Sequence, residues 1–230
     1  MIIEARGVQK WFFRGKGDSN RFFAVQETDL YLRPGKVTVL TGRSGSGKTT
    51  LLSMAGGLLK PDGGSIRADG TDLYAMDDEA LSRFRNQHFG MIPQVSGALK
   101  SLNVMENILL AGGIYPASGE EDNTIRRAER AKSLMQRMNI GDLGGVYPEE
   151  LSGGELRRVS VARALAGTPD VIFADEPTSD LDDENMDIVL KILRESADEG
   201  AAVLIVTHDR EALAFADTAL KMDGGRICEE

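Results

Sequence analysis

Cysteine is almost absent from this sequence, and long apolar runs are absent altogether. The only cysteine among the 230 residues is Cys228, so no disulfide can form within the chain, which suits a reducing compartment. No apolar run approaches the roughly 20 residues that a membrane-spanning helix needs. The N-terminal stretch also lacks the layout of a signal peptide. We therefore expect a cytoplasmic protein that would act at a membrane only through a partner.

Basic residues are in the minority, since 27 Lys and Arg stand against 36 Asp and Glu, for a net charge of −9. A chain this acidic gains little from general attraction to the phosphates of DNA or RNA, so no nucleic-acid partner is expected. Hydrophobic residues make up 41% of the chain and charged residues 27%. This composition predicts a packed core, and the length fits one domain.

Short apolar runs predict a central sheet. Residues 34–42, 170–177 and 201–209 each contain a run typical of a strand buried on both faces. A helical pattern separates the last two runs, and strand–helix–strand alternation implies a parallel sheet with right-handed crossovers. Residues 1–33 favour strands joined by a glycine-containing bend at 13–20.

A helical insert is predicted between these parts of the chain. Residues 103–114 and 125–140 both have helical patterns. In the second pattern, these apolar residues recur at helical spacing: Ile125, Ala128, Ala131, Leu134 and Met138.

The stretch from Gly42 to Thr49 fits the phosphate-loop pattern GxxxxGK[ST] at every position, between a predicted strand and a predicted helix. Its glycines let backbone N–H groups wrap around phosphates, and the helix N-terminus adds partial positive charge. We expect Lys48 to reach the β- and γ-phosphates and the Thr49 hydroxyl to bind Mg²⁺. The predicted nucleotide-binding residues are Gly42, Arg43, Ser44, Gly45, Ser46, Gly47, Lys48, Thr49 and Thr50.

A pair of carboxylates, Asp175 and Glu176, directly follows the apolar run Val171–Ala174. Carboxylates at the C-terminal end of a buried strand lie where open α/β sheets bind ligands. We expect Asp175 to hold Mg²⁺, directly or through water. Glu176 is then placed to orient and polarise an attacking water as a general base.

Gln94 and His208 also follow apolar runs. His208 is one of only two histidines, and it would share a sheet edge with the phosphate loop, from where it could hydrogen-bond the γ-phosphate. Gln94 means little by itself, and only the surrounding motifs make it a candidate catalytic residue and Mg²⁺ ligand. The other histidine, His88, has no such placement and is given no role.

A second glycine-containing loop precedes a helical run, and we call it the signature loop: Leu151, Ser152, Gly153, Gly154 and Glu155. Ser152 and Glu155 have the S-x-x-E spacing of a capping box. Gly153 and Gly154 allow an anion to approach the backbone closely. One domain would thus carry two phosphate-binding loops, which calls for an explanation.

The phosphate loop, Gln94, the signature loop, Asp175-Glu176, residues 179–182 and His208 follow one another in the order of a known family. Over essentially the whole chain, the sequence resembles the ATP-binding subunit of an ATP-binding cassette (ABC) transporter. The resemblance implies an α/β fold: a P-loop NTPase core with a mostly parallel sheet, an N-terminal antiparallel β-subdomain and an inserted helical subdomain. It implies one domain over 1–230, with core and β-subdomain at about 1–94 and 156–230, and the helical subdomain with the signature loop at 95–155.

The resemblance also accounts for the two loops. It implies that the signature loop covers the γ-phosphate held by a second subunit, so that a head-to-tail homodimer or pseudo-dimer encloses ATP. Asp180 and Asp182 match the loop that crosses this interface, where alanine is commoner at position 180. Phe12 matches the aromatic residue that stacks on adenine, with its neighbours Trp11 and Phe13 as alternatives.

The resemblance further implies ATP hydrolysis, with ATP and Mg²⁺ as cofactors, that drives transport through separate transmembrane subunits at the cytoplasmic face of a membrane. A short helix of the membrane partner would sit beside Gln94 and contact Leu99, Leu102, Val104 and Met105. Within the family, the sequence is similar to cassettes for lipoprotein release, macrolide export and antimicrobial-peptide export. The alternative is a soluble cassette that acts in cell division or on DNA or ribosomes. A different phosphate-loop enzyme, such as a kinase, does not fit the signature loop and His208.

Overall fold

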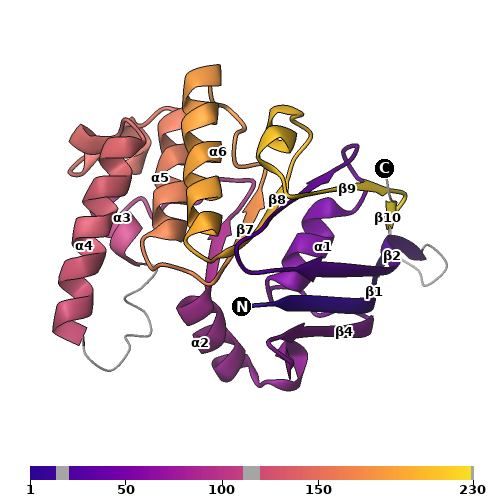
Figure 1. Cartoon of the computed structure of the whole chain (residues 1–230). Coiled ribbons are helices and arrows are strands. Elements are labelled where there is room, and N and C mark those ends of the chain that lie inside the picture. The colour runs from indigo at the N-terminus through magenta and orange to yellow at the C-terminus, as the bar shows by residue number, and fades with distance from the viewer. Residues whose placement is uncertain (14–20, 111–119, 229–230) are drawn as a thin grey trace.

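Two sheets form the framework of the chain, and helices flank the larger one (Figure 1). The structure is a computed structural model that describes residues 1–13, 21–110 and 120–228. Its strands are β1 Ile3–Phe13, β2 Arg21–Leu32, β3 Val37–Thr41, β4 Gly63–Ala68, β5 Thr71–Asp72, β6 Phe89–Ile92, β7 Val171–Asp175, β8 Ala202–Val206, β9 Thr218–Asp223 and β10 Arg226–Cys228.

The larger sheet has six strands in the order β10-β9-β3-β8-β7-β6. Every neighbouring pair is parallel except β10 with β9. The three apolar runs singled out in the sequence form β3, β7 and β8, which lie side by side at the centre. The predicted mostly parallel sheet is therefore confirmed.

Both faces of this sheet are covered, and the strands alternate between two cores. In β8 every residue is buried. Val203 and Ile205 pack into the core that holds α5 and α6, whereas Leu204 and Val206 pack into the core that holds α1 and the N-terminal sheet. Successive side chains of a strand point to opposite faces, so a strand buried on both faces must be apolar throughout.

The N-terminal sheet is antiparallel, with the order β2-β1-β4-β5. This is the predicted β-subdomain, and it packs against α1 (Figure 1). The bend expected between β1 and β2 falls on residues 14–20, which lie outside the described residues.

The α-helices are α1 Lys48–Ala55, α2 Asp78–His88, α3 Val104–Leu110, α4 Glu120–Arg137, α5 Gly153–Leu165 and α6 Asp183–Asp198. Short 3₁₀ turns occur at η2 Leu73–Ala75, η3 Gly141–Leu143, η4 Pro148–Glu150 and η5 Glu211–Phe215. In Figure 1, α3 and α4 lie on the outer side of α5, away from the sheet.

The helical insert buries most of the apolar residues that recur at helical spacing. Ala131, Leu134 and Met138 are buried in one core with Val104 and Ile108 of α3. The predicted helix is present as α4, although Ile125, at the same spacing, is 59% exposed. Val104 is fully buried, so it cannot serve as an exposed contact for a partner.

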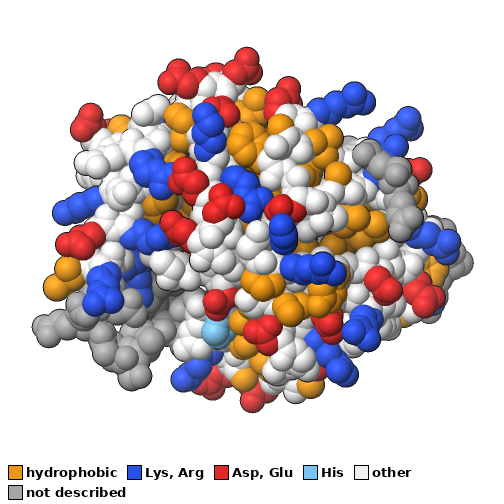
Figure 2. Space-filling view, in the orientation of Figure 1, with side chains coloured by type: hydrophobic (Ala, Val, Ile, Leu, Met, Phe, Trp, Pro, Cys, Tyr) orange, Lys and Arg blue, Asp and Glu red, His pale blue; other side chains and the backbone are white. Residues whose placement is uncertain are grey.

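Acidic and basic side chains of the described residues are interspersed over the face shown in Figure 2. A surface that mixes both signs exerts little long-range pull on a polyanion. Among the described residues, no helix is both long and apolar enough to cross a membrane.

Candidate functional site

The carboxyl ends of four neighbouring strands carry the predicted site residues. The phosphate loop follows β3, Gln94 follows β6, Asp175 ends β7, and His208 follows β8. These strands are parallel, so their carboxyl ends meet at one edge of the sheet, where open α/β sheets bind ligands. The topology therefore gathers residues that are far apart in the sequence.

A cleft of about 980 Å³ opens at this edge and contains most of these residues. It is lined by Phe12, Phe22, Phe23, Ala24, Gly42, Arg43, Ser44, Gly45, Gly47, Lys48, Thr49, Thr50, Gln94, Glu176, Ser179, His208, Gly224 and Gly225. Ser46 and Asp175 do not line it, and both are buried. A second cleft of about 750 Å³, between the N-terminal sheet and β9, contains no predicted site residue.

Two glycines of the phosphate loop are required by close backbone contacts. A Cβ on Gly42 would lie 2.3 Å from the carbonyl oxygen of Met222, and one on Gly47 would lie 2.2 Å from that of Ala24. Their φ angles, 155° and 105°, also disfavour any other residue. The loop is thus wedged between β2 and β9 and leads directly into α1, whose first amide groups can face an anion.

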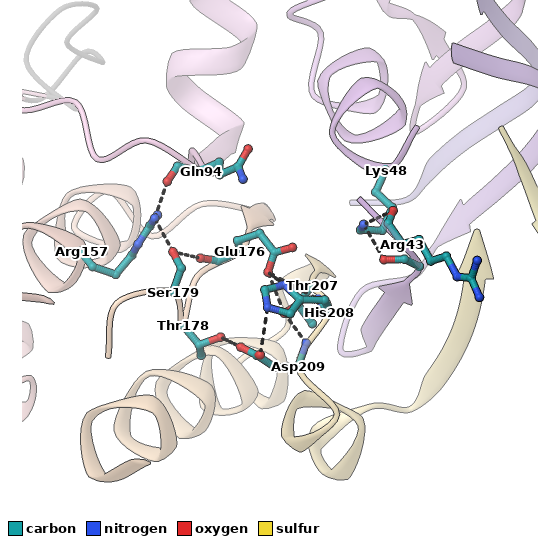
Figure 3. Close-up of polar contacts among 11 residues, drawn as sticks. Arg43, Lys48, Gln94, Arg157, Glu176, Thr178, Ser179, Thr207, His208 and Asp209 are labelled. Atoms are coloured by element: carbon teal, nitrogen blue, oxygen red, sulfur yellow. Dashed lines mark hydrogen bonds and ion pairs between the residues drawn. The ribbon is translucent and has the colours of Figure 1, made fainter. Parts of the chain in front are cut away.

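Lys48 places its ammonium group inside the curve of this loop. Its Nζ donates to the carbonyl oxygens of Gly42, at 2.8 Å, and Arg43, at 3.2 Å (Figure 3). The side chain is only 7% exposed. A buried cation held by the backbone of a glycine-rich loop is suited to bind a polyphosphate.

The aromatic residues of β1 and β2 pair across the two strands, and Phe12, Phe22 and Phe23 line the cleft. Phe12 pairs across the strands with Phe22, with ring centroids 6.1 Å apart, and both line the cleft. Trp11 packs instead against Phe23, at 6.0 Å, and under the guanidinium of Arg21, at 3.7 Å. Neither Trp11 nor Phe13 lines the cleft, so the geometry favours Phe12 as the aromatic contact for a base.

Asp175 is a buried carboxyl group that retains binding capacity. Burial raises its pKa above the ordinary range, and the hydrogen bond from the Thr49 side chain opposes this shift. Among the described residues, no hydrogen-bond partner reaches its Oδ1. Such an orphaned buried oxygen is expected where a ligand or ion completes the site.

Glu176 is held in a fixed orientation by β8. Its Oε2 accepts hydrogen bonds from Thr207 Oγ1, at 3.0 Å, and lies 3.0 Å from Nδ1 of His208 (Figure 3). Its own N–H donates to the carbonyl of Val206 at 2.8 Å, and its φ is +49°. A non-glycine residue at positive φ is strained, and such strain is concentrated at functional sites.

The signature loop forms the capping box that its sequence predicts. Ser152 is the N-cap of α5, and its Oγ accepts from the N–H of Glu155 at 3.3 Å. In return, Glu155 Oε2 accepts from the N–H and the hydroxyl of Ser152, both at 2.7 Å. The loop lies outside the cleft of its own chain.

The two aspartates assigned to the interface loop differ in structure. Asp182 is the N-cap of α6, because its Oδ1 accepts from the N–H of Asn185 at 2.8 Å. Asp180 has a φ of +64°, and its carbonyl oxygen lies 3.0 Å from where a Cβ on Gly154 would stand. The loop that carries Asp180 is therefore packed against the start of α5.

Two side chains beside the cleft escape prediction from the sequence. Arg157 of α5 is buried and donates to the loops after β6 and β7. Asp209 accepts from Thr178 Oγ1 at 2.7 Å, next to His208. A signal for Asp209 exists, since it directly follows His208, but nothing in the run of residues 155–158 marks Arg157 as buried.

The side chains at this edge fit a hard divalent cation. Thr49 and Asp175 offer oxygen ligands beside the phosphate loop, and Gln94 projects into the same cleft. Within the described ranges, no cluster of three or more His, Cys, Asp or Glu residues could hold a metal by itself. A cation with few protein ligands that completes its shell with phosphate oxygens and water matches the preference of Mg²⁺.

These features define a class: a phosphate-loop protein whose cleft also contains a carboxylate, Glu176, from another strand end. A family model described as "ABC transporter" matches residues 25–179, more than half of the chain. Over 228 residues, the chain is 36% identical to the lipoprotein-releasing system ATP-binding protein LolD of Buchnera aphidicola subsp. Schizaphis graminum, covering 99% of this chain and 96% of that protein. It is 37% identical to LolD 1 of Caulobacter vibrioides, covering 98% and 94%.

A longer relative matches equally well over a part of its length. The macrolide export ATP-binding/permease protein MacB of Aggregatibacter actinomycetemcomitans is 36% identical over 229 residues, and the chain spans 34% of it. Two solved dimeric structures of the cassette MJ0796 align with TM-scores of 0.89 and 0.88, at 27% and 28% identity, over 99% of this chain and 97% of theirs. In the first, MJ0796 is bound to ADP and Pi in a post-hydrolysis state.

The chain belongs to the ABC transporter family. The predicted fold class, ATP hydrolysis and the role of an ATP-binding transporter subunit are confirmed, as is the similarity to lipoprotein-release and macrolide-export cassettes. The alternative, a soluble cassette with another role, finds no support among these relatives.

Proposed function

We propose that ATP lies in the 980 Å³ cleft, with its adenine against Phe12 and its phosphates in the phosphate loop. The amide groups of residues 42–50 would cradle the phosphates, and Lys48 would exchange its carbonyl partners for the β- and γ-phosphates. The observation that carries this proposal is that one cleft joins Lys48, Glu176 and His208, which come from three different strand ends.

A Mg²⁺ ion would be held by Thr49, Asp175 and Gln94. When bound, it would supply charge neutralisation for the phosphates. The orphaned Oδ1 of Asp175 and its bond to Thr49 support this assignment. The role of the three side chains is to hold the cation against the polyphosphate and to leave room for the attacking water.

Glu176 would act as the general base. It accepts a proton from the water that attacks the γ-phosphate, and a positioned base is worth roughly 10²–10⁴ in rate. His208 would donate a hydrogen bond to the γ-phosphate. Its link to Glu176 Oε2 keeps the two side chains in one orientation toward the cleft.

Two copies of the cassette would close over ATP, each signature loop covering the γ-phosphate in the partner's cleft. Ser152, Gly153 and Gly154 begin a helix whose N-terminus favours negative charge. The loop lies outside its own chain's cleft, which supports a role in trans. The dimeric structures of MJ0796 support a paired arrangement. We further propose that residues 95–155 form the helical subdomain that carries the signature loop.

The membrane partner would be a permease subunit, which would hold the cassette at the cytoplasmic face of the membrane. The names of LolD and MacB suggest export or release of a lipoprotein or a macrolide-like compound as the coupled process. The exposed apolar side chains of Val95 and Leu99, 81% and 51% exposed, lie in the segment after Gln94 and support a contact there.

The roles of Lys48 and Glu176 are tested by one pair of variants. Lys48→Ala should weaken ATP binding, whereas Glu176→Gln should bind ATP and retain it unhydrolysed, because the amide keeps the shape but cannot accept the proton. Phosphate release and equilibrium nucleotide binding measure both effects. Two substitutions at exposed residues, Lys191→Ala and Glu79→Gln, are matched controls that should behave as wild type. Turnover at the wild-type rate in Glu176→Gln would refute the base.

A further inference from the structure

A buried arginine joins the helix of the signature loop to two loops of the cleft. Arg157 is 2% exposed, and its Nη1 donates to the carbonyl of Pro93 at 2.6 Å. Its Nη2 donates to the carbonyl of Gln94 and to Ser179 Oγ, the latter at 2.7 Å (Figure 3). Ser179 Oγ in turn donates to the carbonyl of Glu176 at 3.0 Å.

The buried guanidinium of Arg157 fixes the geometry of the groups that accept its hydrogen bonds. Burial lowers the pKa of the Arg157 guanidinium, and the nearby carboxylates of Asp180, Asp175 and Glu176 oppose the shift. A buried cation is weak evidence of added stability, because its desolvation offsets much of the attraction. The planar guanidinium, however, fixes several acceptors in one geometry, which neither lysine nor an apolar side chain can do.

Arg157 is also tied to the signature loop at short range. It follows Gly153 by four residues, so both lie on the same face of α5, one turn apart. The backbone of Gly154 lies close to Asp180, since a Cβ on Gly154 would stand 3.0 Å from the Asp180 carbonyl oxygen. The start of α5, Gln94 and the stretch from Glu176 to Asp180 are thus joined by direct contacts around one side chain.

We propose that Arg157 is a positioning residue that keeps Gln94 and Glu176, which serve the cleft of this chain, in register with the signature loop, which serves the cleft of the partner copy. This inference rests on the proposed function of the signature loop in trans. Arg157 does not line the cleft, whereas Gln94, Glu176 and Ser179 do. It therefore acts through residues that touch nucleotide and not on the nucleotide itself.

The test compares Arg157→Gln and Ser179→Ala with Arg163→Gln as the matched control. Arg163 lies on the same helix and donates to the carbonyl of Gly97, but it makes no contact with Ser179 among its described hydrogen bonds. Misplacement by about 1 Å can cost up to about 100-fold in rate. We expect kcat to fall about tenfold or more in Arg157→Gln, with KM for ATP within about threefold of wild type. Arg163→Gln should keep the wild-type kcat.

A double variant separates positioning from general destabilisation. If Arg157 acts through Ser179, Arg157→Gln combined with Ser179→Ala should be no slower than the slower single variant, since coupled residues are not additive. Independent effects would instead multiply, and that result would overturn the proposal. A wild-type kcat in Arg157→Gln would overturn it as well. If Arg157→Gln fails to fold, Ser179→Ala decides alone, and its wild-type kcat would count against the proposal.

A second readout follows dimer closure. In a Glu176→Gln background, Arg157→Gln should reduce the fraction of dimer formed with Mg·ATP, as measured by light scattering, while leaving ATP binding by the monomer unchanged. An unchanged dimer fraction would contradict the inference. Failure of the proposed function itself would look different, because Glu176→Gln alone would then stay monomeric with ATP.

Discussion

The Nδ1 atom of His208 lies 3.0 Å from Oε2 of Glu176, so the proposed γ-phosphate ligand and the proposed base are hydrogen-bonded to each other. The hydroxyl of Thr207 donates to the same oxygen at 3.0 Å. The orientation of the carboxylate is therefore set by the end of β8, and the two functional side chains form one unit.

This pairing predicts a pH effect. The hydrogen bond from His208 to Glu176 and the carboxylate charge raise the pKa of His208 above its ordinary value of 6.5. The interaction then adds stability that is fully present below the ordinary pKa and is lost as pH rises through the raised one. The side chain is 69% exposed, so solvent screening keeps this contribution small.

The pKa itself is measurable by NMR titration of the imidazole protons. In Glu176→Gln the negative charge is gone, so the pKa of His208 should fall toward its ordinary value. His88 of α2, which pairs with Asp170, provides an internal reference, because the substitution should not move its resonance. An unchanged pKa of His208 would mean that the contact does not persist in solution.

We also predict that Asp217 stabilises the fold without any role in the cleft. Its carboxylate accepts from the N–H of Val37 at 2.8 Å and from Arg194 at 2.5 Å, and these bonds, the first above all, hold its pKa far below the ordinary range. Asp217→Asn should lower the free energy of unfolding by about 1 kcal/mol near pH 7, because solvent screening reduces the contribution of an exposed carboxylate. Asp198 also pairs with Arg194, but its side chain is 65% exposed. Asp198→Asn should therefore lower the free energy of unfolding by at most about 0.5 kcal/mol.

Urea unfolding over a range of pH checks both values. Because the native pKa of Asp217 is lowered, its stabilisation is present above the ordinary aspartate pKa of about 3.9 and is lost as pH falls below it. The difference between wild type and Asp217→Asn should therefore shrink in acid. Equal losses from Asp217→Asn and Asp198→Asn would show that the hydrogen bond from the Val37 N–H adds nothing to the stabilisation by Asp217.

The segment after Gln94 predicts a partner contact. Asn107 is fully buried and holds this segment from inside, since its Oδ1 accepts from the N–H of Leu99 at 2.8 Å and its Nδ2 donates to the carbonyl of Leu102 at 2.8 Å. The Leu99 side chain is left 51% exposed on a well-held backbone. Helix-in-groove recognition uses apolar anchors of this kind.

Leu99→Glu should abolish co-purification with the membrane protein that accompanies the wild-type chain, at an unchanged unfolding temperature. Tyr31→Glu, at a position 45% exposed on the N-terminal sheet, is the matched control and should leave co-purification intact. Retained co-purification in Leu99→Glu would place the contact elsewhere.

The sequence alone predicts the residues whose chemistry depends on local pattern. The phosphate loop is recognisable because its glycines, Lys48 and Thr49 must stand at fixed spacing between a strand and a helix, and the structure places them so. The capping box of Ser152 and Glu155 is likewise a local pattern that α5 confirms.

The burial of a side chain is harder to predict from the sequence where it depends on tertiary packing. Arg157 and Arg158 are adjacent, yet only the first is fully buried, because one residue along a helix turns the side chain by about 100°. Helical spacing groups Ile125 with residues that are buried, yet Ile125 is 59% exposed; the family resemblance offered Val104 as a partner contact, yet Val104 is fully buried. Periodicity identifies a helix, but which face meets the core depends on residues far away in the chain.

The central claim is that the signature loop of one copy closes the cleft of another. The most direct measurement mixes two forms of the chain of different tagged size, both with Glu176→Gln and Cys228→Ser. One form carries Ser44→Cys and the other Ser152→Cys, at two exposed positions. Disulfide formation requires Cα atoms within roughly 7 Å, so oxidation reports contact between the phosphate loop and the signature loop of different chains. We predict a strong mixed-size covalent dimer with Mg·ATP and a weak one with ADP. A band that is absent with ATP, or equally strong with ADP, would contradict closure in trans.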